Sequence, residues 1–261
     1  MDETQRLISH MKRFILMTAL LLALPWAAVA QFTYRWTVVP VDSTLDGGTD
    51  YRALKIIEKY SPQVAPLQEI VGYSDAEYDK RRPESELSNF AADVIRAVAE
   101  EKTGEHVDVA LTNFGGIRTS LPKGAVRVYD IFSIFPFDNY IVTFDIKGSD
   151  LRRFLEQMAA RRVEALSGVR MEISGKKIVK LLIGGEPLDD SKTYKFATIN
   201  FLMDAGDGVV LSDVAFNRKD TGVWIRDAIV EYLKAQTERG EQIALKTDGR
   251  VKYLDQKEES R

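Results

Sequence analysis

The stretch Leu111-Thr112-Asn113-Phe114-Gly115-Gly116-Ile117-Arg118 ends an alternating apolar run over 107–111 and opens a loop. The alternation predicts a strand. Glycines after a strand end present backbone N–H groups to a concavity that suits an anion, and they leave room for a ligand. The arginine adds a guanidinium that can hold a phosphate with two hydrogen bonds. The stretch indicates an anion-binding loop; the alternative is a structural turn whose arginine pairs with a surface carboxylate.

Two later stretches carry groups that complement such a loop. In Phe135-Pro136-Phe137-Asp138-Asn139, proline restricts the backbone and an aromatic residue follows in a polar turn. Phe137 is therefore a candidate for stacking on a nucleobase, a contact worth about 1–3 kcal/mol; the alternative is that its ring covers the core.

The third stretch, Phe201-Leu202-Met203-Asp204-Ala205-Gly206-Asp207-Gly208, places a carboxylate between two glycines. Asp207 can accept hydrogen bonds from two vicinal hydroxyls, such as a ribose diol offers. A calcium loop and a plain acidic turn are the alternatives, and two aspartates supply few oxygens for calcium.

Composition sets limits on the class of protein. The chain has 261 residues, 45% hydrophobic and 29% charged, as in ordinary globular proteins. Its net charge of −3 gives no basic surface for double-stranded DNA or RNA. It contains no cysteine, which excludes disulfides, thiolate nucleophiles and thiolate metal sites.

Residues 1–30 have the pattern of a signal peptide. Met11-Lys12-Arg13 is a basic start, an apolar run follows from Phe14, and Ala28-Val29-Ala30 suits cleavage before Gln31. An N-terminal membrane anchor is the alternative, and Met11 rather than Met1 is a candidate initiator. We expect export to a periplasm, with no membrane span after cleavage.

The remaining pattern predicts an α/β (α+β) fold of mixed β-sheets flanked by helices. We expect an N-terminal strand and linker over 31–50, one domain over 51–255 and a charged tail over 256–261. Helices are expected over 50–60, over 85–102, from 149 or 150, and from about 221. Strands are expected over 34–41, 66–73, 107–111, 141–146, 169–174, 178–183 and 194–198, with turns at 147–148, 174–175 and 184–185. The charged run 74–83 reads as a solvated loop.

The three stretches together, in this order, resemble the C-terminal domain of the 5′-nucleotidases, which include bacterial UDP-sugar hydrolases and animal ecto-5′-nucleotidases. That family carries Asn-Gly-Gly-Gly-Ile-Arg, Pro-Phe-Gly-Asn and Phe-Leu-x-x-Gly-Gly-Asp-Gly. The corresponding stretches here are 113–118, 136–139 and 201–208, and Glu84 to Phe90 is similar to a fourth family motif. The resemblance runs from about Tyr51 to Tyr253.

The resemblance implies roles for particular residues. Phe137 and Phe201 would sandwich the base, and Asn113, Gly115, Gly116 and Arg118 would form the phosphate side. Asp207, with Asn139, would bind the ribose hydroxyls. Gly168 matches a family glycine near the base.

Departures from the family pattern lie mainly at the phosphate side. Phe114 replaces a glycine of the loop, and Ala205 replaces another glycine. Pro83 stands where the family has a further phosphate-binding arginine, with Arg82 as a neighbour that could substitute.

In this family hydrolysis belongs to an N-terminal domain with two divalent metals, which clamp the attacking and leaving oxygens. The chain has only two histidines, His10 and His106, and no Asp-x-His or Gly-Asn-His element. We therefore expect no catalytic or metal-binding residues and no cofactor in this chain, with divalent metal held by a separately encoded metallophosphatase partner. The alternatives are a stand-alone periplasmic nucleotide- or nucleoside-binding protein and a degenerate domain that no longer binds.

Overall fold

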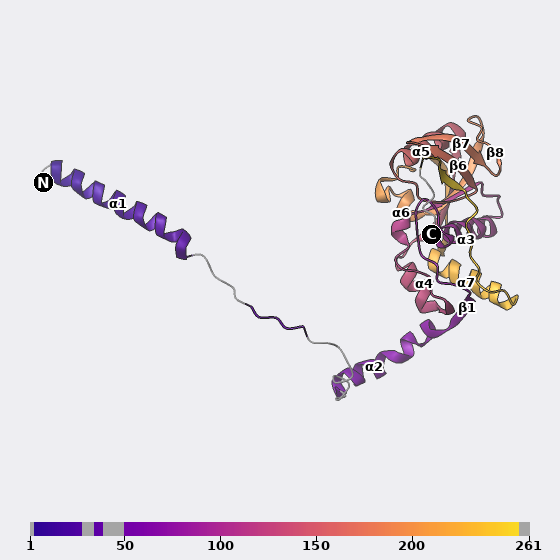
Figure 1. Cartoon of the computed structure of the whole chain (residues 1–261), viewed down its shortest axis with the longest axis horizontal. Coiled ribbons are helices and arrows are strands. Elements are labelled where there is room, and N and C mark those ends of the chain that lie inside the picture. The colour runs from indigo at the N-terminus through magenta and orange to yellow at the C-terminus, as the bar shows by residue number, and fades with distance from the viewer. Residues whose placement is uncertain (1–2, 28–33, 39–49, 256–261) are drawn as a thin grey trace. The chain divides into compact units, whose positions relative to one another are not determined.

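The computed structural model describes residues 3–27, 34–38 and 50–255. The chain divides into two compact units, 1–55 and 56–261, and each is described by itself. The first unit contains helix α1 (Glu3–Ala27) (Figure 1). No helix in the described ranges combines the length and apolar character that a membrane crossing needs. The signal peptide remains a prediction, and its cleavage position after Ala30 lies outside the described residues.

The main sheet of the second unit has five strands in the order β10-β4-β9-β2-β5. Strands β2 and β9 run parallel, while β4, β5 and β10 are antiparallel to their neighbours. The sheet is therefore mixed, as expected. Its strands are β2 (Val109–Thr112), β4 (Tyr140–Lys147), β5 (Ala165–Ser167), β9 (Thr193–Ile199) and β10 (Ala215–Trp224).

Two smaller sheets complete the unit. One has the order β11-β6-β7-β8, and the other pairs β1 with β3. These strands are β1 (Ile70–Ser74), β3 (Gly124–Arg127), β6 (Val169–Ser174), β7 (Lys177–Ile183), β8 (Glu186–Pro187) and β11 (Val251–Tyr253).

Helices flank the sheets, and α3 shows why its sequence forms one. Ser85 caps the N-terminus through the Ser88 N–H, and Gly104 ends the helix in the left-handed conformation that glycine favours. The flanking helices are α3 (Glu86–Thr103), α4 (Val128–Ile134), α5 (Gly148–Arg161), α6 (Asn200–Met203) and α7 (Ile225–Glu238), whereas α2 (Tyr51–Val64) buries no residue. Single 3₁₀ turns are η2 (Ala65–Gln68), η3 (Phe114–Gly116) and η4 (Gly206–Gly208).

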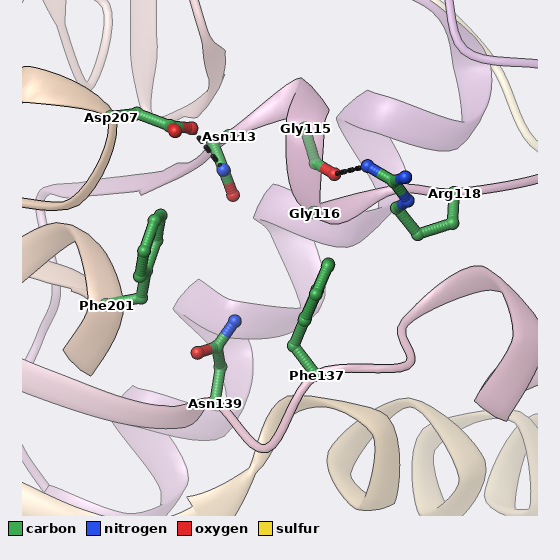
Figure 2. Close-up of a pocket in the computed structure, with 8 residues that line it drawn as sticks. All are labelled: Asn113, Gly115, Gly116, Arg118, Phe137, Asn139, Phe201 and Asp207. Atoms are coloured by element: carbon green, nitrogen blue, oxygen red, sulfur yellow. Dashed lines mark hydrogen bonds between the residues drawn. The ribbon is translucent and has the colours of Figure 1, made fainter. Parts of the chain in front are cut away.

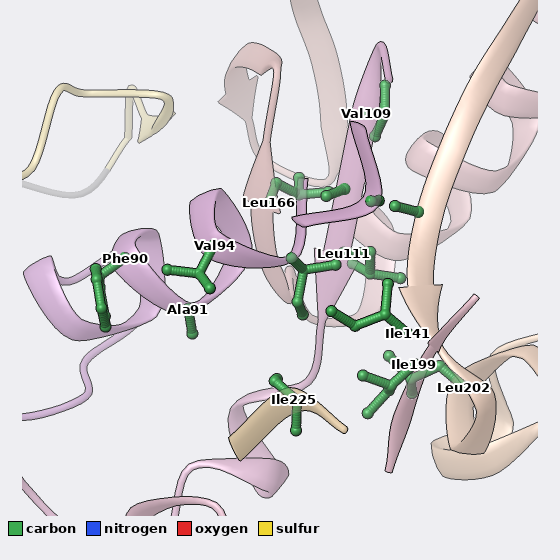
Figure 3. Packing of buried hydrophobic residues seen from close by; sticks show 14 of the residues in the cluster. Phe90, Ala91, Val94, Val109, Leu111, Ile141, Leu166, Ile199, Leu202 and Ile225 are labelled. Atoms are coloured by element: carbon green, nitrogen blue, oxygen red, sulfur yellow. The ribbon is translucent and has the colours of Figure 1, made fainter. Parts of the chain in front are cut away.

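The core lies between α3 and the main sheet. Figure 3 shows Ala91 and Val94 of α3 in the same buried cluster as Leu111 of β2 and Leu166 of β5. Within the sheet the rings of Phe144 and Phe196 stack with centroids 5.0 Å apart. Because this packing fixes the central strands relative to one another, it also fixes the spacing of the loops at their ends.

The fold class is confirmed, and several element predictions are wrong. Residues 34–38 form no strand, and 39–41 lie outside the described residues. The segment 66–73 starts as η2, because Pro66 cannot donate a ladder hydrogen bond, and becomes a strand only at Ile70. The first predicted helix of the domain does not stop at 60 but runs through Pro62 to Val64.

Further corrections concern helix starts. No turn separates β4 from α5, which begins at Gly148 with Lys147 as its capping position. The segment around Thr221 is strand, since β10 pairs with β4 along the sheet edge, and α7 begins only at Ile225. Because β10 is an edge strand with many polar residues, the hydrophobic pattern of the sequence did not indicate a strand there.

Candidate functional site

All five strands of the main sheet begin or end at the same border of the sheet, here called the pocket edge, which runs across the strands. Strands β2 and β9 end there, and their antiparallel neighbours begin or end there in register. The three stretches singled out in the sequence leave this edge, after β2, before β4 and after β9. Ligands of open α/β sheets bind at strand ends for this reason, since loops from neighbouring strands converge.

These loops line one pocket of about 230 Å³ (Figure 2). Its lining comprises Asn113, Gly115, Gly116 and Arg118 from the first loop, Phe137 and Asn139 from the second, and Phe201 and Asp207 from the third. Eight of the nine predicted site residues are therefore brought together, from positions up to 94 residues apart.

Two phenylalanine rings face each other across this pocket. Figure 2 shows Phe137 and Phe201 both nearly edge-on, on opposite sides of the gap. Their residues are 45% and 41% exposed, although a free phenylalanine gains by burial. Two exposed, facing rings fit a flat aromatic ligand between them.

Asp207 and Asn113 join the first and third loops. The Asn113 Nδ2 donates to Asp207 Oδ2 over 2.5 Å, and the Asn113 Oδ1 is buried with no hydrogen-bond partner among the described atoms. Ala205 has φ of 68° and Asp207 has φ of 54°, a left-handed conformation that is strained for alanine and better tolerated by aspartate. Backbone strain of this kind is often found at functional sites. Asp207 keeps its other carboxylate oxygen free of side-chain hydrogen bonds within the described part of the chain.

Arg118 occupies the side of the pocket away from Asp207 (Figure 2). Its Nη1 donates to the Gly115 carbonyl over 3.3 Å, and its guanidinium carbon is 5.8 Å from the centroid of the Phe137 ring. A Cβ at Gly116 would lie 2.8 Å from Asn113 Oδ1, so a side chain there would displace the Asn113 amide. The pocket thus has a cation at one end and a carboxylate at the other.

Phe114 does not enter the pocket, although it replaces a glycine of the family loop. Its ring is buried against Ala92 and Ala165, and its N–H donates to Glu164 Oε2 over 2.7 Å. The guanidinium of Arg82 lies 4.1 Å from the ring centroid and donates to both oxygens of Glu164, at 2.9 and 3.0 Å. The substitution is absorbed by a neighbouring cluster. Arg82 is engaged in that cluster and does not line the pocket, and the charged run 74–83 is only partly solvated.

Gly168 lies elsewhere. It follows β5 at the end opposite to the pocket edge, since Ser167 pairs with Ala110 and Ala165 pairs with Thr112. With φ of 76°, its backbone passes so close to Asp108 that a Cβ would lie 2.0 Å from that carbonyl oxygen. The geometry accounts for a glycine here by close packing of the backbone.

Two supporting residues escaped the sequence analysis. Glu164 anchors the first loop, and Asn200 accepts the Tyr140 N–H over 2.9 Å, joining the Phe201 segment to the Phe137 segment. Asn200 precedes Phe201 directly, so its place beside a candidate residue was the available signal. Glu164 carried none, because its partners lie 50 and 82 residues away.

No group of three or more His, Cys, Asp or Glu side chains in the described ranges is placed to hold a metal ion. His106 is 2.8 Å from Glu100 through Nδ1, at the surface. The pocket therefore presents two aromatic rings, a carboxylate and a guanidinium.

Comparison with known proteins shows the family of this chain. The profile of the 5′-nucleotidase C-terminal domain matches residues 64–213. This chain belongs to the 5′-nucleotidase C-terminal domain family. It is 30% identical to the protein UshA of Yersinia enterocolitica over 193 residues, 71% of this chain and 34% of that protein.

A second curated protein and a solved structure are also similar to this chain. The trifunctional nucleotide phosphoesterase YfkN of Bacillus subtilis is 27% identical over 84% of this chain and 16% of its own length. The 5′-nucleotidase precursor structure from Thermus thermophilus superposes with a TM-score of 0.67 at 26% identity, over 80% of this chain and 44% of that one. The chain spans about a third or less of these two curated relatives.

Proposed function

We propose that this chain is the nucleotide-binding half of a 5′-nucleotidase-type phosphohydrolase, acting in nucleotide catabolism or salvage. The observation that carries this is the pair of exposed, facing rings, Phe137 and Phe201, in a pocket with Asp207 and Arg118 at its ends. A base stacks between the rings, Asp207 accepts the ribose hydroxyls, and Arg118 with the loop N–H groups holds the phosphate.

Aromatic stacking, and a carboxylate that binds the ribose hydroxyls, do not discriminate between bases. The ligand class is therefore a nucleoside monophosphate or a related nucleotide. Family membership and the likeness to nucleotide phosphoesterases support this class. The chemistry would come from a separate metallophosphatase, since hydrolysis by two metals needs clustered ligands, which the described residues do not offer.

We place the docking surface for that metallophosphatase on α2. None of its described side chains is buried, and Ile57 and Val64, both in the second unit, are exposed large apolar residues on one side of the helix. Ile57→Glu should abolish co-purification with the metallophosphatase and leave nucleotide binding unchanged. Unchanged co-purification would remove α2 from the proposal.

The first test is calorimetric titration of the purified chain with AMP. We expect measurable binding that weakens about 5- to 150-fold in Phe201→Ala, as loss of one stacking contact predicts. Absence of heat at millimolar AMP would favour the degenerate domain.

The second test is phosphate release from AMP with Mn²⁺ or Zn²⁺. We expect none from the pure chain, and release once the metallophosphatase is added. Turnover by the pure chain would overturn the division of labour. Binding without any activating partner would favour a stand-alone binding protein.

We also propose that the chain is exported and cleaved after Ala30. Sequencing the N-terminus of protein recovered from the periplasmic fraction should begin at Gln31. Recovery of the intact N-terminus from membranes would favour the anchor instead.

A further inference from the structure

The turn that carries Phe137 is fastened to the start of α7. The Ile225 N–H donates to the Asn139 carbonyl over 2.9 Å, and Arg226 Nη2 lies 2.6 Å from Asp138 Oδ1. Both contacts cross between segments more than eighty residues apart in the chain. They are possible because β10 ends beside the start of β4, where Trp224 pairs with Tyr140.

Arg226, the second residue of α7, has a largely buried side chain with contacts on several sides. Its side chain is only 19% exposed, and its guanidinium carbon lies 4.7 Å from the Phe132 centroid and 5.0 Å from that of Trp224. Its Nε is buried without a hydrogen-bond partner among the described atoms. Burying an unpaired donor is unfavourable, so the arrangement calls for a compensating interaction. The pairing with Asp138 and the two aromatic contacts are the compensating interactions present.

Asp138 itself contributes little to the core, since its side chain is 65% exposed. It occupies the third position of the Pro-Phe-Asp-Asn turn, immediately between the ring of Phe137 and the pocket residue Asn139. A change in the position of Asp138 therefore affects two residues that line the pocket, Phe137 and Asn139. Arg226 does not line the pocket and cannot contact a ligand there.

We propose that Arg226 is a positioning residue of the nucleotide site: through Asp138 it holds the turn so that the Phe137 ring faces Phe201. The inference rests on the proposed function and adds a determinant outside the three motif loops. Residue 226 also lies beyond the 64–213 segment that the family profile matches. The Phe201 side is braced separately, by Asn200 on the Tyr140 N–H.

The test compares Arg226→Met, Asp138→Asn and the double variant with the wild type. Amide hydrogen exchange of the segment 136–140 should rise about three- to tenfold in each single variant, and AMP should bind about three- to tenfold more weakly. The double variant should be no worse than Arg226→Met, since partners in one contact are not additive. Arg226→Lys, which keeps the charge, should recover part of the affinity.

Two controls separate positioning from general stability. Arg152→Met with Asp190→Asn breaks another ion pair of 2.8 Å, between α5 and the segment before β9 and away from the pocket, and should change neither exchange in 136–140 nor affinity. In a Phe137→Ala background, Arg226→Met should lose its effect on AMP affinity, because Arg226 acts through that ring. Asp138→Asn, at an exposed position, keeps the test valid if Arg226→Met folds poorly.

The outcomes are distinguishable. A wild type that binds no AMP overturns the proposed function and, with it, this role of Arg226. A wild type that binds AMP, with exchange and affinity unchanged in Arg226→Met and Asp138→Asn, overturns the positioning role alone. An undiminished effect of Arg226→Met in the Phe137→Ala background does the same.

Discussion

Phe114 and Phe137 are both loop phenylalanines at the same sheet edge, yet they face opposite environments. Phe114 is 5% exposed and packs beside Arg82 and Glu164, while Phe137 is 45% exposed and faces the pocket. The difference shows that a departure from a motif need not alter a site. The buried ring became part of the scaffold behind the loop, and the exposed ring remains available to a ligand.

The test with the largest expected effect truncates the Phe114 and Phe137 rings in turn. Phe114→Ala should lower the free energy of unfolding by about 3–5 kcal/mol, because it leaves a cavity where a buried ring was. Phe137→Ala should change it by less than about 1 kcal/mol, but weaken AMP binding. Urea denaturation and calorimetry of both variants check this. Equal losses of stability would mean that the two rings play the same part.

The scaffold behind the first loop depends next on Glu164. Glu164→Gln removes the charge that receives Arg82 and the Phe114 N–H, so unfolding should become easier by about 2 kcal/mol. Glu172→Gln, on a partly exposed carboxylate 3.5 Å from Lys180, is the matched control and should cost less than about 0.5 kcal/mol. Denaturation midpoints that shift alike in both variants would contradict the role of Glu164.

The next prediction tests whether Asp207 binds the ribose hydroxyls in the pocket. Asp207→Asn should weaken AMP binding by about 1 kcal/mol, roughly fivefold, because a charged acceptor for the ribose hydroxyls is lost. The same substitution should have no effect on binding of 2′,3′-dideoxy-AMP. Asp204→Asn, whose carboxylate pairs with Arg218 outside the pocket, serves as control. Equal weakening for both nucleotides would place Asp207 away from the ribose.

The smallest expected effect concerns the sheet that carries both loops. Hydrogen bonds from Lys195 and then Lys219 lower the pKa of Glu105 from 4.5 to about 2. Burial lowers the pKa of Lys195, but the hydrogen bonds to Asp145 and Glu105 outweigh it and raise that pKa. A lowered carboxyl pKa contributes stability above pH 4.5 that is lost as the pH falls toward 2.

Glu105→Gln should therefore be slightly less stable than the wild type at pH 6, and the gap should narrow from pH 4.5 to pH 3. Denaturation midpoints at these three values check it. A gap that stays constant across them would show that Glu105 is not coupled to the lysines in the folded protein.

Much of this could be predicted because the signals are local. The caps Ser85 and Gly104 act within one helical turn, and the alternation over 169–174 and 178–183 marks a hairpin. The three binding stretches each combine a strand end with special residues. Among the elements missed were β10, whose polar residues belong to an edge strand, and the short strands β3, β5, β8 and β11.

The sequence by itself determined the chemistry available: a glycine loop with Arg118, two turns with aromatic rings, and a carboxylate between glycines. It determined these because turn conformation and ligand chemistry depend on residue type and close neighbours. The tertiary structure alone decided that Phe137 faces Phe201, that Phe114 is buried and that Arg226 grips Asp138. The physical reason is the strand order, which brings together contacts that span 60 to 94 residues of chain, such as Tyr140 with Asn200 and Asn113 with Asp207.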